Sequence, residues 1–150
     1  MREVLERNCA LTLCGPALPQ VALADFLSSG GYDSHLRRIR RVFQHSIAQT
    51  TRTIERVFPE GTKITRPAGG FVLWLELPRP FDSRQLFAEA LETGICFAPG
   101  DVFSASGRYR HCLRLSCASP WDANIEVGLA TLGALVAAQL AGAGTCPRLR

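Results

Sequence analysis

The sequence is nearly devoid of lysine. Lys63 is the only lysine among 17 basic residues, and the other basic side chains are all arginines. A lysine amine is the group that forms a Schiff base with a carbonyl carbon, so the chain offers one side chain for that chemistry. The net charge is +4, which is too weak to indicate a nucleic-acid-binding surface.

Several catalytic sequence patterns are also missing. The chain has no GxSxG nucleophile elbow, no GxGxxG fingerprint and no P-loop. It has no CxxC pair, its three histidines are scattered, and both Cys9/Cys14 and Cys112/Cys117 are separated by four residues. We therefore interpret the six cysteines as buried or incidental thiols and expect no metal site.

We expect neither export nor membrane insertion. The first residues, MREVLERN, are charged and lack the apolar stretch of a signal peptide. Free thiols are typical of reducing compartments, and a membrane span needs about 20 predominantly apolar residues. The expected location is the cytoplasm, with no membrane-spanning segment.

The N-terminal half is predicted to be mainly helical. A short helix begins near Pro19 and ends at the Ser-Ser-Gly-Gly of residues 28–31. A long helix follows and is closed by Pro59 and Gly61. Its apolar stripe consists of Tyr32, Leu36, Ile39, Phe43, Ile47, Ile54 and Val57.

The C-terminal half is predicted to alternate between strands and helices. Strands are expected over residues 71–77, 95–98 and 111–117. Asp82 and Gln85 are expected to cap a helix that Gly94 ends, and Ser119 with Pro120 to begin a last helix. The residues expected to be buried by these two helices are Leu86, Phe87, Ala90, Leu91, Ile125, Leu129, Leu132 and Val136.

These elements predict an α/β fold. Apolar residues make up 47% of the chain and charged residues 20%, which favours a packed globular domain over disorder. The expected architecture is a two-layer sandwich, a small mixed or antiparallel sheet with helices on one face. Residues 1–15 are not assigned to an element, residues 16–140 form the domain, and residues 141–150 are expected to be a flexible tail.

Two charged features have alternative interpretations. Arg37, Arg38, Arg40 and Arg41 lie off the apolar stripe of the long helix, where they form either a solvated face or a basic patch for nucleic acid. Arg114 lies between Leu113 and Leu115 in a predicted strand. Its guanidinium either pairs with an acidic side chain within the fold or grips a ligand carboxylate through two parallel hydrogen bonds.

Three segments carry a resemblance to a known family. RPAGGFVLWLEL, GICFAPGDVF and HCLRLSCAS occur in this order and resemble the C-terminal small domain of fold-type-I, pyridoxal-phosphate (PLP) dependent aminotransferases. The stretch ALPQVALADFLSSGGYDSHLRRIRRVF resembles the MocR branch of the GntR-type transcriptional regulators. In those proteins an aminotransferase-like body follows an N-terminal winged helix-turn-helix. The resemblance runs from about residue 16 to about residue 140.

The resemblance implies a role for Arg114 and a set of partners. The arginine of the family's R-L-S strand binds the substrate α-carboxylate, and Arg114 stands at that place. PLP is implied in the full-length protein, with a homodimer, an upstream large domain and an amino-acid-like ligand. DNA would be bound only through an N-terminal winged helix, which these residues do not contain.

The resemblance also shows a departure at the cofactor. The family's Schiff-base lysine lies in an S-x-S-K-like segment, which this sequence lacks, and Lys63 in GTKITRPAGG matches no cofactor motif. We therefore expect no cofactor-binding residue in this chain, no PLP bound by the chain alone and no activity of the chain by itself.

Three functions remain open at this point. The first is the C-terminal part of a MocR-type regulator that senses an amino-acid or PLP-related ligand. The second is the C-terminal domain of an aminotransferase that moves an amino group between amino and keto acids. The third is a stand-alone binding module that has kept this fold.

Overall fold

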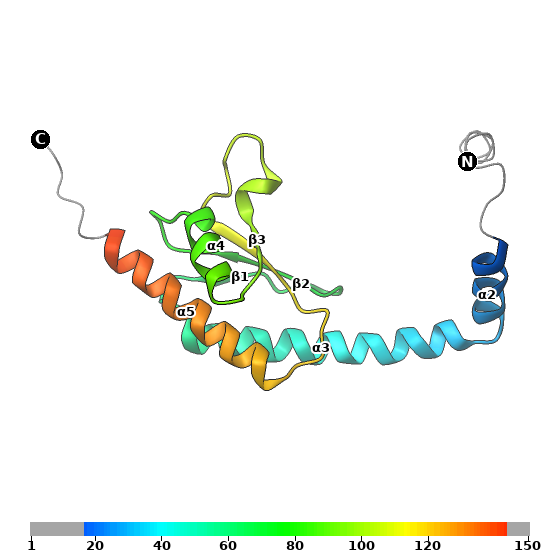
Figure 1. Cartoon of the computed structure of the whole chain (residues 1–150). Coiled ribbons are helices and arrows are strands. Elements are labelled where there is room, and N and C mark those ends of the chain that lie inside the picture. The colour runs from blue at the N-terminus through cyan, green and yellow to red at the C-terminus, as the bar shows by residue number, and fades with distance from the viewer. Residues whose placement is uncertain (1–16, 144–150) are drawn as a thin grey trace, which may run out of the picture. The chain divides into compact units, whose positions relative to one another are not determined.

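The computed structural model describes residues 17–143 (Figure 1). The chain divides into two compact units, residues 1–39 and 40–150. Their boundary falls inside the long helix α3, Gly31–Val57. The predicted domain boundary near residue 16 and the unassigned segment before it lie outside the described residues.

The first unit contains α2, Ala17–Ser28, which confirms the short helix. The backbone of Gly30 has a positive φ of 75° between α2 and α3, the left-handed conformation that favours glycine after a helix. The ring of Phe26 lies edge-on to His35, with 6.5 Å between ring centroids. None of the residues of α2 is buried.

In the second unit, the buried face of α3 is more polar than the predicted stripe. Ser46, Thr50, Thr53 and Ile54 are buried, whereas Ile47 packs at the edge of the core. The hydroxyl of Ser46 donates a hydrogen bond of 2.8 Å to the carbonyl oxygen of Ser119. An apolar periodicity cannot reveal these positions, because Ser and Thr are not apolar and most buried hydroxyls depend on a hydrogen-bond partner elsewhere in the chain.

Four antiparallel strands form one sheet in the order β1-β2-β4-β3. The strands β2, Val72–Glu76, and β4, Cys112–Ser116, were both predicted. The predicted strand at residues 95–98 is displaced, because β3 is Ala98–Pro99. The edge strand β1, Lys63–Ile64, was not predicted, since two residues are too few to show an alternating pattern.

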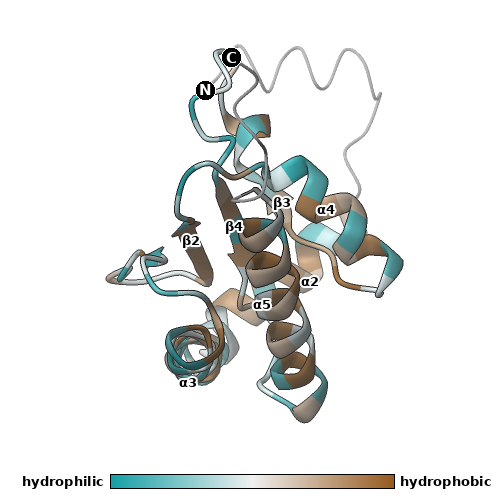
Figure 2. Cartoon of the chain, turned by 90° about the vertical axis from the view of Figure 1, so that its left-hand side faces the viewer, coloured by the Kyte–Doolittle hydropathy of each residue, from teal (hydrophilic) through white to brown (hydrophobic). Residues whose placement is uncertain are grey.

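The helices of the second unit cover one face of this sheet (Figure 2). Leu73, Leu75 and Leu113 have no exposed surface, and they pack with side chains from α3, α4 (Ser83–Glu92) and α5 (Ala123–Ala143). The observed architecture is therefore the predicted two-layer α/β sandwich. Its sheet is wholly antiparallel.

The ends of α4 and α5 correct three predictions. Asp82 caps α4 by accepting a hydrogen bond from the backbone N–H of Arg84, but Gln85 donates to Glu89 instead of closing a capping box. Leu91, which was expected to be buried, is 55% exposed. The predicted cap of the last helix at Ser119 is wrong, because Asp122 accepts from the N–H of Ile125.

The last helix is longer than expected and carries little charge. It continues to Ala143, and so extends into the predicted tail. Residues 127–147 contain no charged side chain, and α5 is long and apolar enough to cross a membrane. Its Leu129, Leu132 and Val136 are buried in the core, although only 22% of the apolar window is buried.

A close approach joins α5 to α3. A Cβ atom added at Gly133 would lie 2.5 Å from the carbonyl oxygen of Val57, which leaves room only for hydrogen. Gly128, on the same helix, has no atom within 4 Å of the same position. Alanine substitutions at these two glycines therefore separate the effect of alanine's helix propensity from the effect of its added methyl group.

We predict that Gly133→Ala lowers the free energy of unfolding by about 1–3 kcal/mol, because overpacking displaces α3 from α5. Gly128→Ala, the matched control, should raise it by about 0.5–1 kcal/mol, since alanine favours a helix over glycine. Chemical denaturation of both variants measures the difference. Equal effects of the two substitutions would contradict the close packing.

Candidate functional site

Arg114 lies at the centre of the sheet, on the face that the helices leave uncovered. Its Cα pairs with Trp74 of β2 on one side and with Ala98 of β3 on the other. Its neighbours Leu113 and Leu115 are 0% and 8% exposed. Because side chains alternate along a strand, the guanidinium lies on the opposite face, where Arg114 is exposed.

One aromatic ring contacts the guanidinium of this arginine, and two further rings pack with that one in a cluster beside it. The guanidinium carbon of Arg114 lies 4.9 Å from the centroid of the Phe103 ring, a cation–π contact. The ring of Trp74 packs edge to face against Phe103 and Tyr109, with 5.5 Å and 5.4 Å between the ring centroids. Arg114, Trp74, Phe103 and Tyr109 form what we call the arginine site.

Within the described part of the chain, no acidic partner neutralises Arg114. Among residues 17–143, the ion pairs involve other basic side chains, and none includes Arg114. The alternative that Arg114 is paired with an acidic group is therefore not seen in this part of the chain. A guanidinium that rests on a ring keeps its N–H donors available for a carboxylate.

The segment of residues 100–110 brings Phe103 and Tyr109 to the site. It begins with the 3-10 helix η1, Gly100–Phe103. A Cβ atom at Gly100 would overlap the carbonyl oxygen of Tyr109, so the two ends of the segment touch through backbone. The sequence predicted no element for this segment and no contact between its aromatic residues and Arg114.

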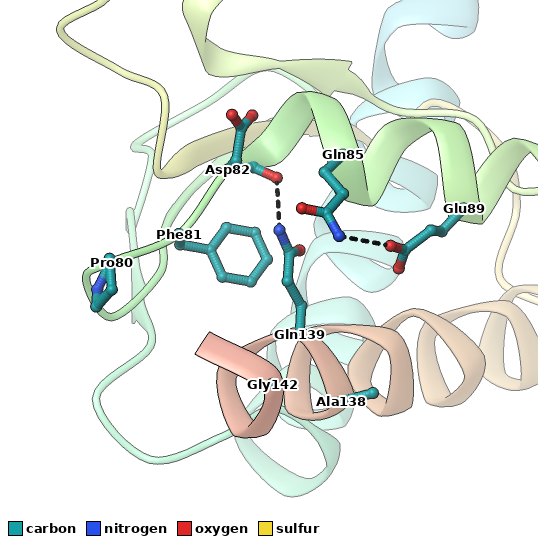
Figure 3. Close-up of a pocket in the computed structure, with 8 residues that line it drawn as sticks. All are labelled: Pro80, Phe81, Asp82, Gln85, Glu89, Ala138, Gln139 and Gly142. Atoms are coloured by element: carbon teal, nitrogen blue, oxygen red, sulfur yellow. Dashed lines mark hydrogen bonds between the residues drawn. The ribbon is translucent and has the colours of Figure 1, made fainter. Parts of the chain in front are cut away.

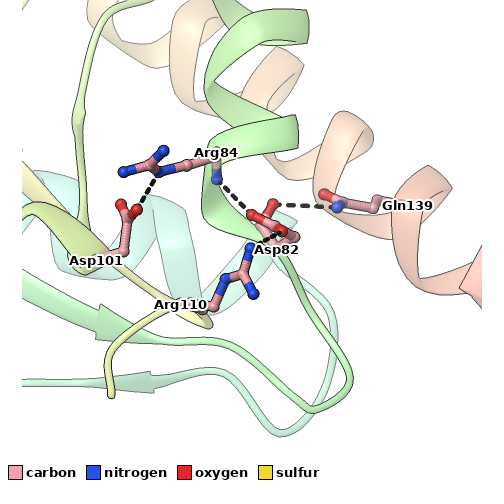
Figure 4. Close-up of polar contacts among 5 residues, drawn as sticks. All are labelled: Asp82, Arg84, Asp101, Arg110 and Gln139. Atoms are coloured by element: carbon pink, nitrogen blue, oxygen red, sulfur yellow. Dashed lines mark hydrogen bonds and ion pairs between the residues drawn. The ribbon is translucent and has the colours of Figure 1, made fainter. Parts of the chain in front are cut away.

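Two ion pairs hold this segment to the start of α4 (Figure 4). Arg84 pairs with Asp101, whose side chain is only 8% exposed. Arg110 pairs with Asp82 at 3.4 Å, and the N–H of Ser83 donates to the carbonyl oxygen of Arg110 at 2.8 Å. We call the pairs Arg84–Asp101 and Arg110–Asp82 the clamp.

A cavity lies away from the arginine site, between α4 and α5 (Figure 3). It has a volume of about 640 Å³ and is lined by Pro80, Phe81, Asp82, Gln85, Glu89, Ala138, Gln139 and Gly142. Gln139 crosses it and donates to the carbonyl oxygen of Asp82 at 3.1 Å. None of the four residues of the arginine site lines it, so we do not assign the site there.

The described cysteines behave as unpaired thiols. Cys112 and Cys117 are buried and Cys96 is exposed, whereas Cys9, Cys14 and Cys146 lie outside the described residues. Burial raises the pKa of Cys117, and burial with the nearby Glu76 carboxylate raises the pKa of Cys112. Raised pKa values keep both thiols protonated and unreactive.

The other candidate groups are the histidines and the four arginines in the N-terminal part of α3. Over residues 17–143, no three His, Cys, Asp or Glu side chains gather where they could hold a metal ion. His111 is buried against Arg79 at 3.1 Å. Arg37, Arg38, Arg40 and Arg41 are all exposed, which agrees equally with a solvated face and with a basic patch.

Comparison with known proteins identifies where such a fold occurs. Residues 3–132 match the family model of aminotransferase class I and II. Two similar proteins are the uncharacterized HTH-type transcriptional regulators YjiR and YdcR of Escherichia coli K12. YjiR is 41% identical over 117 residues, covering 78% of this chain and 25% of that protein. YdcR is 34% identical over 139 residues, which cover 93% of this chain and 30% of that protein.

A solved structure with the same fold is LysN, an α-aminoadipate aminotransferase from Thermus thermophilus. Its sequence is 31% identical, and the match has a TM-score of 0.83 and covers 93% of this chain and 36% of the LysN chain. LysN was solved in complex with N-(5'-phosphopyridoxyl)-L-leucine. The chain thus spans about a quarter to a third of the length of the curated regulators it matches.

PLP, the cofactor of this family, does not fit the chain's own residues. The cofactor needs a lysine amine for its Schiff base, and Lys63 is the only lysine. The Lys63 side chain is 76% exposed on the edge strand β1, where its amine lies 3.6 Å from the carboxylate of Glu76. We therefore assign no cofactor chemistry to these residues.

We predict that the chain forms no stoichiometric covalent adduct with PLP, because an exposed lysine has nothing to orient the cofactor. Visible spectroscopy after mixing, followed by borohydride reduction and peptide mapping, measures this. Slow labelling of Lys63 and of the N-terminal amine to similar extents is expected. A stoichiometric adduct on Lys63 that the control Lys63→Arg abolishes would refute the prediction.

Proposed function

The chain belongs to the aminotransferase class I and II family, and from this we propose that it is the C-terminal part of a MocR-type transcriptional regulator. In this proposal the aminotransferase-like body of the complete protein senses an amino-acid or PLP-related ligand. The observation that carries the proposal is the identity of 41% and 34% to two HTH-type transcriptional regulators. Both matches cover more than three quarters of this chain.

Arg114 is the residue of this chain that we propose to bind the ligand. Its guanidinium is charged at any working pH and presents a planar fork of donors that matches a carboxylate. The open sheet face, the ring of Phe103 at 4.9 Å and the lack of an acidic partner among residues 17–143 support this role. The chain's contribution is to bind and orient the carboxylate, not to carry out a covalent step.

The rest of the proposed protein lies outside these residues. PLP would be held by an upstream large domain that supplies the lysine, and the uncovered sheet face would meet that domain. We further propose a cytoplasmic homodimer that binds DNA only through an N-terminal winged helix. We propose no membrane partner, because Leu129, Leu132 and Val136 of α5 pack in the core.

An aminotransferase is the second candidate. The similarity to LysN, with 31% identity and a TM-score of 0.83, favours it. In that case Arg114 would bind the α-carboxylate of an amino-acid substrate, so both candidates give this residue the same task. They differ in the complete protein, where only the regulator has a DNA-binding domain.

The complete gene product separates the two candidates. It should be tested for transamination with a panel of L-amino acids and 2-oxoglutarate, and for binding to DNA from its own promoter region. The regulator predicts DNA binding that responds to an amino acid or to PLP, without steady turnover. Steady turnover without DNA binding would select the enzyme.

We predict that Arg114→Lys weakens amino-acid binding by the complete protein about ten- to a hundredfold. The substitution keeps the charge but loses one charge-assisted hydrogen bond, worth about 1.5–3 kcal/mol. The measurement is calorimetric titration with the L-amino acid that most raises Tm in a screen of all twenty. PLP loading is checked separately.

The control ligand is the amide of the same amino acid, which lacks the carboxylate. The affinity for this amide should be low and nearly the same in wild type and variant. Equal affinity of both proteins for the amino acid itself would show that Arg114 does not bind the carboxylate.

A further inference from the structure

The arginine site is built from distant parts of the chain, and Phe103, the last residue of η1, lies outside the strands of the sheet. Arg114 and Trp74 are neighbours across β4 and β2. Phe103 reaches them from segment 100–110 and is 44% exposed. An exposed ring outside the sheet stays against a guanidinium only if the segment that carries the ring is held in place.

The clamp holds both ends of segment 100–110 to the start of α4. Asp101 is two residues before Phe103, and Arg110 directly follows Tyr109. Their partners, Arg84 and Asp82, are both at the first turn of α4. A helix terminus is a rigid anchor, because Asp82 also caps α4 through the N–H of Arg84 and its carbonyl oxygen accepts from Gln139 of α5.

One half of the clamp is costly to break. The side chain of Asp101 is 8% exposed, and one of its carboxylate oxygens has no hydrogen-bond partner in the described structure. Arg84 is its only ion-pair partner there. Removing the Arg84 guanidinium would leave a buried carboxylate unpaired, which favours movement of the segment toward water.

We infer that the clamp is a positioning device for ligand recognition: by fixing segment 100–110 it holds Phe103 against Arg114 and so sets the direction of the guanidinium fork. Arg84, Asp101 and Phe103 are positioning residues that act through Arg114. The inference rests on the proposed role of Arg114 as the carboxylate-binding residue. It adds that the affinity of Arg114 for a carboxylate depends on the Arg84–Asp101 ion pair, which does not include Arg114 itself.

The position of Arg114 can be read directly by NMR in this chain, without any ligand. An aromatic ring 4.9 Å from the guanidinium carbon shifts the resonance of the Arg114 Nε–H proton through its ring current. Phe103→Leu should remove this shift and Phe103→Tyr should retain it. Arg84→Gln and Asp101→Asn should reduce it, because the segment is released.

The matched control is Arg56→Gln. It breaks the ion pair of Arg56 with Glu126, a 2.6 Å contact between α3 and α5 whose arginine is exposed to a similar extent, 64% against 69% for Arg84. This variant should leave the Arg114 resonance unchanged. Circular dichroism and Tm of every variant show whether the fold is retained, and Asp101→Asn, which keeps the shape of the side chain, serves if Arg84→Gln unfolds.

Acetate, the smallest carboxylate probe, tests whether the position affects binding. At constant ionic strength, the Arg114 resonance should respond to acetate with saturation in the wild type. Phe103→Leu and Arg84→Gln should raise the Kd by about two- to fivefold, the range expected when one exposed cation–π contact is lost. Arg56→Gln and Phe103→Tyr should not raise it.

Each result bears on the inference separately from the proposed function. An Arg114 resonance that Phe103→Leu or Arg84→Gln leaves unchanged would overturn the clamp, as would an equal Kd for acetate in all variants. No saturable response to acetate in the wild type would instead count against the proposed carboxylate-binding role of Arg114. If instead Arg114→Lys leaves amino-acid binding by the complete protein unaffected, the proposed function fails. The resonance of Arg114 still decides whether the clamp sets its position.

Discussion

The alternation of side chains along β4 is the constraint on which the rest of this structure depends. Leu113 and Leu115 fill the core beneath the helices, so the residue between them has one direction left. A slip of one residue in the β2–β4 register would place the guanidinium in the apolar core and two leucines in water. Burial of the leucines therefore fixes the side of the sheet on which Arg114 stands.

The opposite face is assembled by contacts over long distances in the sequence. Trp74 comes from β2, and Phe103 and Tyr109 come from the segment that precedes β4. That segment is held from behind by the start of α4. The face that we propose to meet a ligand is thus stabilised by the helix layer through Asp82 and Arg84, although the sheet separates this face from the helices.

Sequence patterns predicted the parts of the fold that depend on periodicity. The alternation in residues 71–77 and 111–117 predicted β2, β4 and the direction of Arg114, and the apolar repeat of α5 predicted its buried face. The sequence patterns missed features that depend on partners elsewhere in the chain. The buried hydroxyl of Ser46 needs the carbonyl of Ser119, and Asp122 caps α5 in place of Ser119. The clamp was missed for the same reason, since Arg84 and Asp101 are 17 residues apart and no local pattern links them.

A crystal structure of the complete protein with a bound L-amino acid tests the central claim most directly. The account predicts that both oxygens of the α-carboxylate lie about 2.7–2.9 Å from two nitrogens of Arg114, as in a bidentate pair, with Phe103 still beneath the guanidinium. A carboxylate bound elsewhere, or Arg114 paired with an acidic side chain of the preceding domain while the ligand is bound, would contradict it.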